Sequence, residues 1–276
     1  MSEIYVSINS ALVKYENASL HISDLSIQRG FGIFDFLKTI NGVPVFIDDY
    51  LDRFFNSIKE MSMDINFNRE TLLNNINSLM AKNQIPDSGI KIILTGGYSE
   101  DGYTSTQPNL LIIQTPFKLN PDNFNHGINL VSYSHQRQLP SVKTIDYLQA
   151  IRLNKFIKEN NAQDVLYHNN GQICECPRAN IFVVMGRKII TPKTNILKGI
   201  TRKRILEMEI EGYEIVESDI NMKDLSSFDE AFICSSTKNI LPVFSIDNHS
   251  INQGIIGHLT LKLNEKLNAM ISEYVN

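Results

Sequence analysis

The sequence predicts a two-domain α+β protein with a small N-terminal domain and a larger C-terminal domain. Short β-rich runs that end in turn signals, with helical periodicity between them, predict the mixed secondary structure. A stretch rich in Pro, Asn and Asp at 116–126 predicts the boundary. We expect an N-terminal α+β domain over 1–117, a linker over 118–127 and a C-terminal domain over 128–276. Because strands and helices do not alternate as strict β–α–β units, a doubly wound parallel sheet is not expected.

Individual elements follow from local patterns. Three hairpins are expected where β-rich runs flank a turn: 34–40 with 43–46, 164–168 with 172–174, and 181–184 with 187–190. Further strands are expected at 128–134 and 231–234. Helices are expected where apolar residues recur at helical spacing, over 49–61, 70–81, 146–160, 201–210 and 255–274.

Composition narrows the class of protein. The chain has 276 residues, of which 42% are hydrophobic and 20% charged, as in ordinary globular proteins. Its net charge of −4 and the absence of a basic cluster argue against a nucleic-acid partner. No apolar stretch approaches the roughly 20 residues that cross a bilayer, so no membrane partner is expected. Three cysteines and the absence of a secretory leader favour the cytoplasm.

Lys143 is the first candidate for chemistry. It lies between the expected strand at 128–134 and the helix that begins near Asp146. A lysine amine attacks a carbonyl only when it is deprotonated, which requires burial or neighbouring positive charge. A loop between a strand and a helix near a domain boundary is a suitable place, although a single lysine is more often an ordinary surface residue.

Glu175 follows Lys143 by 32 residues (175 − 143) and lies between apolar residues. A carboxylate in such a place needs a positively charged partner. The nitrogen of a pyridine ring is one such partner, because a nearby carboxylate favours the protonated ring. A strand-edge salt bridge is the alternative interpretation.

Three further segments are candidates for binding an anion. Gly199 precedes Ile200 and Thr201 at an expected helix start, where N–H groups are free. Ser235, Ser236 and Thr237 follow an expected buried strand and offer hydroxyl groups. Arg53 on the first long helix could bind a phosphate with two parallel hydrogen bonds. An ordinary capped helix, a polar turn and a solvated helix face are the structural alternatives.

These elements, in this order, resemble the class IV aminotransferases, which are fold type IV pyridoxal-phosphate (PLP) enzymes. The family contains branched-chain aminotransferases, D-amino-acid aminotransferases and aminodeoxychorismate lyases. The resemblance is carried by six segments across nearly the whole chain: Arg29 to Asp35, Tyr50 to Arg53, Lys143 to Leu148, Glu175 with Asn180 to Phe182, Leu197 to Arg202, and Ser235 to Thr237 with Pro242 and Val243. Each segment is weak evidence alone, and the six in sequence are strong.

The resemblance implies a fold and a cofactor site. The C-terminal domain is expected to be an α/β pseudobarrel that binds pyridoxal 5′-phosphate as a Schiff base on Lys143. Glu175 is expected to contact the ring nitrogen, Tyr147 to lie near the phenolic oxygen and Leu197 to pack against the ring. The phosphate group is expected among Arg53, Ile200, Thr201, Ser236 and Thr237. No metal site is implied.

The resemblance also implies a reaction. An amino acid, branched-chain or of D configuration, would pass its amino group to the cofactor, and a 2-oxo acid such as 2-oxoglutarate would then receive it, with ping-pong kinetics. The freed Lys143 amine would act as the general base at Cα. A homodimer is implied, because the enzymes of this family complete each active site with a loop of the partner.

Departures from the family pattern concern the substrate side. Phe31 stands where the family commonly has aspartate, Phe34 stands where it has tyrosine, and the residues after Glu175 are bulkier and charged. The candidates for binding substrate are Arg29, Phe34, Lys91, Arg137 and Arg178. The Lys-to-Glu spacing resembles the D-amino-acid branch, whereas Tyr147 resembles the branched-chain branch, so the handedness of the substrate stays open.

Other interpretations are weaker. 4-Amino-4-deoxychorismate lyase, which eliminates pyruvate on the same scaffold, is the nearest rival. A serine acylase would rest on Ser235 and Lys238 in an SxxK pattern, which lacks its companion motifs. Zinc binding by Cys174, Cys176 and His168 would lack a second pair of ligands. A PLP-free interaction protein is the remaining alternative.

Overall fold

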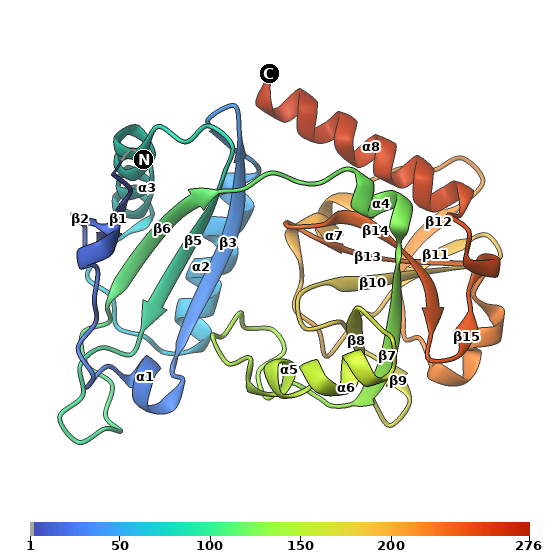
Figure 1. The fold of residues 1–276 in the computed structure, drawn as a ribbon, viewed down its shortest axis with the longest axis horizontal. Coiled ribbons are helices and arrows are strands. Elements are labelled where there is room, and N and C mark those ends of the chain that lie inside the picture. The colour runs from blue at the N-terminus through green and yellow to red at the C-terminus, as the bar shows by residue number, and fades with distance from the viewer. Residues whose placement is uncertain (1–2) are drawn as a thin grey trace. The chain divides into compact units, whose positions relative to one another are not determined.

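The computed structural model describes residues 3–276, which form two compact units (Figure 1). The first unit runs to Lys118 and also contains Val142–Asp146 and Tyr274–Asn276. The second unit contains Leu119–Ser141 and Tyr147–Glu273. The segment that carries Lys143 therefore belongs to the first unit, although the sequence assigned it to the C-terminal domain. The expected linker contains a short helix, α4 (Asp122–His126).

The first unit is built on a six-stranded antiparallel sheet with the strand order β2-β1-β6-β5-β3-β4. Helix α2 packs on β3, and helix α3 packs on β1 and β6. The elements of this unit are β1 (Tyr5–Ile8), β2 (Ala11–Lys14), η1 (Tyr15–Asn17), α1 (Leu25–Arg29), β3 (Gly32–Ile40), β4 (Val43–Pro44), α2 (Ile47–Glu60), α3 (Arg69–Asn83), β5 (Ser88–Thr95) and β6 (Leu110–Pro116).

Local sequence explains the helices and the first hairpin. The apolar stripe of α2 places Leu51 and Phe54 in the core, where both are fully buried. The side chain of Asn68 accepts a hydrogen bond from Thr71 N, which caps the start of α3. Asn41 and Gly42 both have positive φ, as a two-residue hairpin turn between β3 and β4 requires.

The second unit contains a nine-stranded mixed sheet with the order β12-β11-β10-β13-β14-β7-β8-β9, and β15 pairs with β14. Figure 1 shows this sheet curling around its interior, which is filled by apolar residues such as Leu166, Ile181, Ile233 and Val243. The strands are β7 (Ile128–Ser134), β8 (Asp164–Asn169), β9 (Gln172–Ile173), β10 (Asn180–Met185), β11 (Lys188–Thr191), β12 (Glu214–Glu217), β13 (Glu230–Ser235), β14 (Asn239–Ile246) and β15 (His249–Ser250).

Helices complete the second unit. They are α4, α5 (Leu148–Arg152), α6 (Asn154–Glu159), α7 (Ile200–Leu206), η2 (Met222–Ser227), η3 (Asn252–Gly254) and α8 (His258–Val275), whose last two residues belong to the first unit. The carboxylate of Glu230 accepts hydrogen bonds from Leu259 N and Thr260 N, so it satisfies free N–H groups at the start of α8. Within residues 3–276, no helix has the length and the apolar character that crossing a membrane requires.

The expected α+β class and all three expected hairpins are confirmed. Two helices differ from the expectation. The helix expected over 146–160 is divided into α5 and α6 at Leu153, whose ψ of −3° departs from the value of a regular α-helix. The helix expected over 201–210 ends at Leu206, and the chain then turns through Gly212 with positive φ.

Candidate active site

Glu175 lies in the short segment that leads from β9 into β10. Backbone hydrogen bonds fix this segment, because Tyr167 N donates to Glu175 O at 2.9 Å and Cys174 N donates to Tyr167 O at 2.9 Å. A turn closed by Cys176 N and Ala179 O follows directly. The Glu175 side chain is only 6% exposed, so its carboxylate is held among protein groups at a set position.

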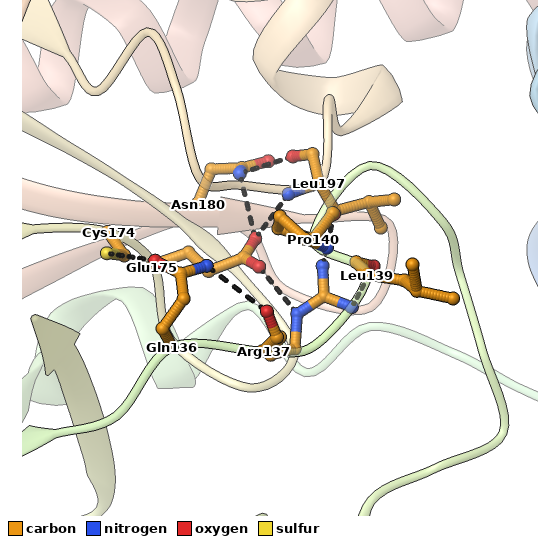
Figure 2. Close-up of polar contacts among 8 residues, drawn as sticks. All are labelled: Gln136, Arg137, Leu139, Pro140, Cys174, Glu175, Asn180 and Leu197. Carbon is orange, nitrogen blue, oxygen red and sulfur yellow. Dashed lines mark hydrogen bonds and ion pairs between the residues drawn. The ribbon is translucent and has the colours of Figure 1, made fainter. Parts of the chain in front are cut away.

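Three side-chain or backbone donors surround the Glu175 carboxylate (Figure 2). Arg137 Nε donates to Oε1 at 2.8 Å, and Leu197 N donates to Oε2 at 2.9 Å. Asn180 Nδ2 lies 3.5 Å from Oε2 and also donates to Leu197 O at 2.7 Å. Charged hydrogen bonds of this kind are the stronger ones, so they compensate for the loss of water around a buried carboxylate.

Arg137 belongs to the segment that follows β7. Besides Glu175, its guanidinium group donates to the carbonyl oxygens of Leu139 and Pro140 (Figure 2). Its side chain is 20% exposed, so the ion pair is largely removed from solvent. The sequence named Arg137 as a candidate for binding substrate, and the structure places it against the candidate ring-nitrogen acid.

The buried cysteines near Glu175 are poor nucleophiles and poor metal ligands in this state. Burial raises the pKa of Cys174 to about 11, and it raises the pKa of Cys176 well above its ordinary value. A protonated thiol neither attacks carbonyls efficiently nor binds a metal. Over residues 3–276, no group of three or more His, Cys, Asp and Glu residues is arranged to hold a metal ion.

The start of α7 and the end of β13 bring together the residues expected to bind phosphate within the second unit. Helix α7 packs against β13, and its first residues, Ile200 and Thr201, are buried. The turn after β13 carries Ser236 and Thr237, with Thr237 Oγ1 lying 3.3 Å from Ser235 Oγ. These amide and hydroxyl groups can donate hydrogen bonds to the oxygens of a phosphate group.

A buried arginine fixes α7 to the sheet. The Arg202 side chain is 3% exposed and donates to Thr191 Oγ1, to Pro192 O and to the carboxylate of Glu217. The same ion pair lowers the pKa of Glu217 from its ordinary value. The candidate phosphate-binding segment is therefore anchored to the ends of β11 and β12.

Lys143 lies in a segment that adds to the edge of β3. Phe34 N donates to Lys143 O at 2.9 Å, and Ile145 N donates to Gly32 O at 3.0 Å. The Lys143 amine lies 4.5 Å from the centre of the Phe34 ring. Lys91 on β5 approaches the same ring at 6.0 Å. Phe34 therefore lies next to the candidate catalytic amine, and Lys91 also lies near the Phe34 ring.

Arg53, the expected phosphate arginine, is held by Asp35 of β3. Arg53 Nε and one terminal nitrogen donate to the two carboxylate oxygens of Asp35 at 2.9 and 2.6 Å. Asp35 is fully buried, and the Tyr50 ring lies 5.3 Å from Arg53 Cζ. Both residues belong to the first unit, and their two hydrogen bonds fix the orientation of the Arg53 guanidinium group.

The remaining candidates are distributed over both units. Arg29 is exposed at the end of α1 in the first unit, as is Lys91 on β5. Arg178 is exposed in the turn before β10 in the second unit. Tyr147 is half-buried immediately before α5.

Sequence reasoning missed three features of the site. It assigned no role to Asp35, to Asn180 or to the pairing of Arg137 with Glu175. A signal was present only for Asp35, because it occupies a core-facing position between Ile33 and Leu37 in an alternating strand. A buried aspartate at such a position needs a partner.

Comparison with known proteins identifies the class. A family model described as amino-transferase class IV matches residues 32–246. This match covers well over half of the chain, and it includes Lys143, Glu175 and the segment from Leu197 to Thr201. The chain belongs to the class IV aminotransferases, which are PLP-dependent enzymes, so the resemblance found in the sequence is confirmed.

Individual relatives agree with this assignment. The chain is 29% identical to a putative branched-chain-amino-acid aminotransferase of Methanocaldococcus jannaschii, over 95% of this chain and 94% of the relative. It is 26% identical to the D-alanine aminotransferase of Bacillus licheniformis, over 97% and 98% of the two chains. The fold resembles that of the branched-chain aminotransferase of the archaeon Thermoproteus uzoniensis solved with norvaline, with a TM-score of 0.88, 23% identity and coverage of 99% and 96%.

The donor set of this chain fits the cofactor. Glu175 supplies a buried acid of the kind that a pyridine nitrogen requires, already bonded to N–H donors. Ser236, Thr237 and the start of α7 supply neutral donors for a phosphate group. Lys143 supplies an amine beside an aromatic ring. Each part of pyridoxal 5′-phosphate therefore has residues of suitable chemistry in the chain.

Proposed function

We propose that this protein transfers an amino group from a branched-chain amino acid or a D-amino acid to a 2-oxo acid such as 2-oxoglutarate. The observation that carries the proposal is the buried Glu175 carboxylate held by Arg137 and Leu197 N, because an acid at the ring nitrogen is what amino-group transfer on PLP requires. The relatives named as branched-chain and D-alanine aminotransferases support the substrate class.

Each residue has a proposed role at the cofactor. Lys143 would hold the cofactor through its aldehyde carbon, Glu175 would keep the ring nitrogen protonated, Tyr147 would donate to the phenolic oxygen and Leu197 would cover the ring. The phosphate would be held by the arginine, amides and hydroxyls expected from the sequence: Arg53, Ile200, Thr201, Ser236 and Thr237. The bidentate Asp35 pair supports Arg53 in this role, since it fixes the orientation of the guanidinium group.

Bound PLP supplies an aldehyde that condenses with amines and a protonated ring that accepts the electron pair left when a proton departs from the substrate Cα. The amine of Lys143 would act as the general base that takes the proton from the substrate Cα. The Phe34 ring lies beside this amine, with its centre 4.5 Å away. The Glu175 carboxylate, held by Arg137 and Leu197 N, would contact the ring nitrogen.

The substrate carboxylate needs a cation or a pair of donors. Arg29, Lys91 and Arg178 are exposed cations and keep this proposed role. Arg137 is engaged by Glu175, which supports a role for Arg137 at the ring-nitrogen acid in place of a role at the substrate. Phe34 is proposed to contact the substrate as well as Lys143.

We also propose a cytoplasmic homodimer. Several large apolar side chains are exposed, notably Ile22 and Tyr103 in the first unit and Leu148 and Ile151 in the second. Leu148 and Ile151 lie one turn apart on α5, so both can contact the same protein partner. The three cysteines are free, as suits a reducing compartment. Light scattering coupled to gel filtration tests the dimer, and a stable, active monomer would contradict it.

The reaction is tested with purified protein, PLP and a panel of L- and D-amino acids with 2-oxoglutarate, by following glutamate formation. We expect one branched-chain or D-amino acid to give turnover, with parallel lines in a double-reciprocal plot. The protein is also incubated with aminodeoxychorismate, because the fold resembles a putative 4-amino-4-deoxychorismate lyase of Legionella pneumophila (TM-score 0.83, 24% identity, coverage of 92% and 96%). Pyruvate release from aminodeoxychorismate, without turnover of amino acids, would refute the aminotransferase proposal.

A further inference from the structure

Asn180, the first residue of β10, joins the groups that surround Glu175. The residue is 5% exposed, and its Nδ2 donates to Leu197 O at 2.7 Å (Figure 2). The same nitrogen lies 3.5 Å from Glu175 Oε2, the oxygen that accepts from Leu197 N at 2.9 Å. Asn180, Glu175 and Leu197 therefore form a closed set of hydrogen bonds within the second unit.

Gly199 faces the other end of the Asn180 amide. Its φ of −68° is accessible to any residue, so backbone conformation does not require glycine here. A β-carbon at Gly199 would instead overlap Asn180 Oδ1. The next atoms, Asn180 Cγ at 3.4 Å and Arg202 Cβ at 3.6 Å, are at ordinary contact distances. Asn180 Oδ1 is therefore the atom that occupies the space of a β-carbon at Gly199.

The two observations restrain Asn180 from both ends of its amide. Rotation of the side chain away from Gly199 would break the bond to Leu197 O and the contact with Glu175 Oε2. The position of the Glu175 carboxylate is therefore linked to the position of the backbone immediately before α7. Arg137 Nε donates to the other oxygen, Oε1, so this bond is distinct from the link through Asn180.

We propose that Asn180 is a positioning residue for the cofactor, one that fixes the Glu175 carboxylate and the Leu197–Gly199 turn in a single arrangement. The inference rests on the proposed function, because Glu175 and this turn are assigned there to the ring nitrogen and to the ring face. Asn180 acts through both groups and contacts no reacting atom. Glycine is required at 199 because the Asn180 amide fills the space of a side chain.

Two variants of Asn180 separate hydrogen bonding from packing. Asn180→Asp keeps the shape of the side chain, but it removes the N–H donor and places a second carboxylate beside Glu175. Asn180→Ala removes both the donor and the volume. We expect both variants to bind PLP about tenfold more weakly or worse, with Asn180→Asp the weaker of the two. The matched control is Asn160→Ala, an exposed asparagine of the same unit whose amide donates to Phe156 O.

Affinity is measured by quenching of protein fluorescence as PLP is added to cofactor-free protein, and the visible absorption band of the bound cofactor is titrated with pH. We expect the Asn180 variants to shift the pH dependence of this band, because a displaced Glu175 protonates the ring less well. We expect kcat to fall more than KM changes. Affinity and titration equal to wild type in Asn180→Asp would overturn the proposal.

The link to Gly199 is tested without PLP by a double-mutant cycle. Gly199→Ala should lower the urea midpoint of the cofactor-free protein, because the added methyl group displaces the Asn180 amide. In the N180A background the same change should have little effect. If Gly199→Ala lowered the urea midpoint equally in the wild-type and N180A backgrounds, the proposed link between Asn180 and Gly199 would be wrong. If wild-type protein bound no PLP, the proposed function would fail, whereas this cycle would still report on the link.

Discussion

Replacing Arg137 by glutamine distinguishes two roles for this arginine. The substitution removes the charge and the Nε–H that donates to Glu175 Oε1 at 2.8 Å, and it keeps a polar side chain. If Arg137 supports Glu175, the loss appears in the folded protein without any ligand. If Arg137 binds the substrate carboxylate instead, the loss appears only in KM for the amino acid and the 2-oxo acid.

The size of the effect follows from the burial of the pair. Breaking a buried ion pair by removing one partner typically costs about 3–5 kcal/mol. The Arg137 and Glu175 side chains are 20% and 6% exposed, and Glu175 keeps its bond to Leu197 N. We therefore expect a loss near the lower limit, about 3 kcal/mol of unfolding free energy.

The assay is urea unfolding of cofactor-free wild-type and Arg137→Gln protein at pH 7, followed by steady-state kinetics of both. Arg178→Gln is the matched control, because Arg178 is an exposed arginine of the same unit and its loss should change stability by less than about 0.5 kcal/mol. A variant with wild-type urea stability and a KM raised at least tenfold would refute the supporting role and restore the substrate-binding role.

Two further changes test electrostatics elsewhere. Burial lowers the pKa of Lys38 from 10.5 to about 8, so the unfolded chain binds more protons between these values and stability should rise with pH there. In urea titrations between pH 7 and 10.5, Lys38→Met should abolish the rise and increase the unfolding free energy by up to about 3 kcal/mol at pH 7. The exposed Lys59→Met should do neither. Glu217 pairs with Arg202, which lowers the pKa of this glutamate below 4.5. The stability that Glu217 contributes should therefore be present above pH 4.5 and lost as pH falls. Glu217→Gln should lower the unfolding free energy at pH 7 by about 1 kcal/mol and should remove this part of the loss at acidic pH. The same fall in unfolding free energy below pH 4.5 in wild-type and Glu217→Gln protein would contradict the assignment.

Features that depend on neighbouring residues in the chain could be predicted from the sequence. The β3–β4 hairpin was predicted because Asn41 and Gly42 are the residues that accept the positive φ of a tight turn. Helix α2 was predicted because its apolar residues recur on one face and that face is buried. The family was also identified, since six short segments kept their order and spacing.

Features that depend on tertiary contacts were not predictable from local pattern. The division between α5 and α6 was missed because Leu148 and Ile151 have the spacing of a core-facing stripe and yet are exposed. The choice of Arg137 as the partner of Glu175 joins residues from the segments after β7 and β9, and no local pattern encodes it. The same holds for the addition of Val142–Asp146 to the first unit through β3.

The central claim is that Lys143 carries the cofactor, and borohydride reduction of the PLP-loaded protein tests it most directly. Reduction fixes a bound cofactor covalently to its lysine, and peptide mass spectrometry then locates the modified residue. We predict that Lys143 carries the modification in the wild-type protein, and that Lys143→Ala loses both the visible absorption band and amino-group transfer. Modification of another lysine, or colour and transfer that persist in Lys143→Ala, would contradict the account.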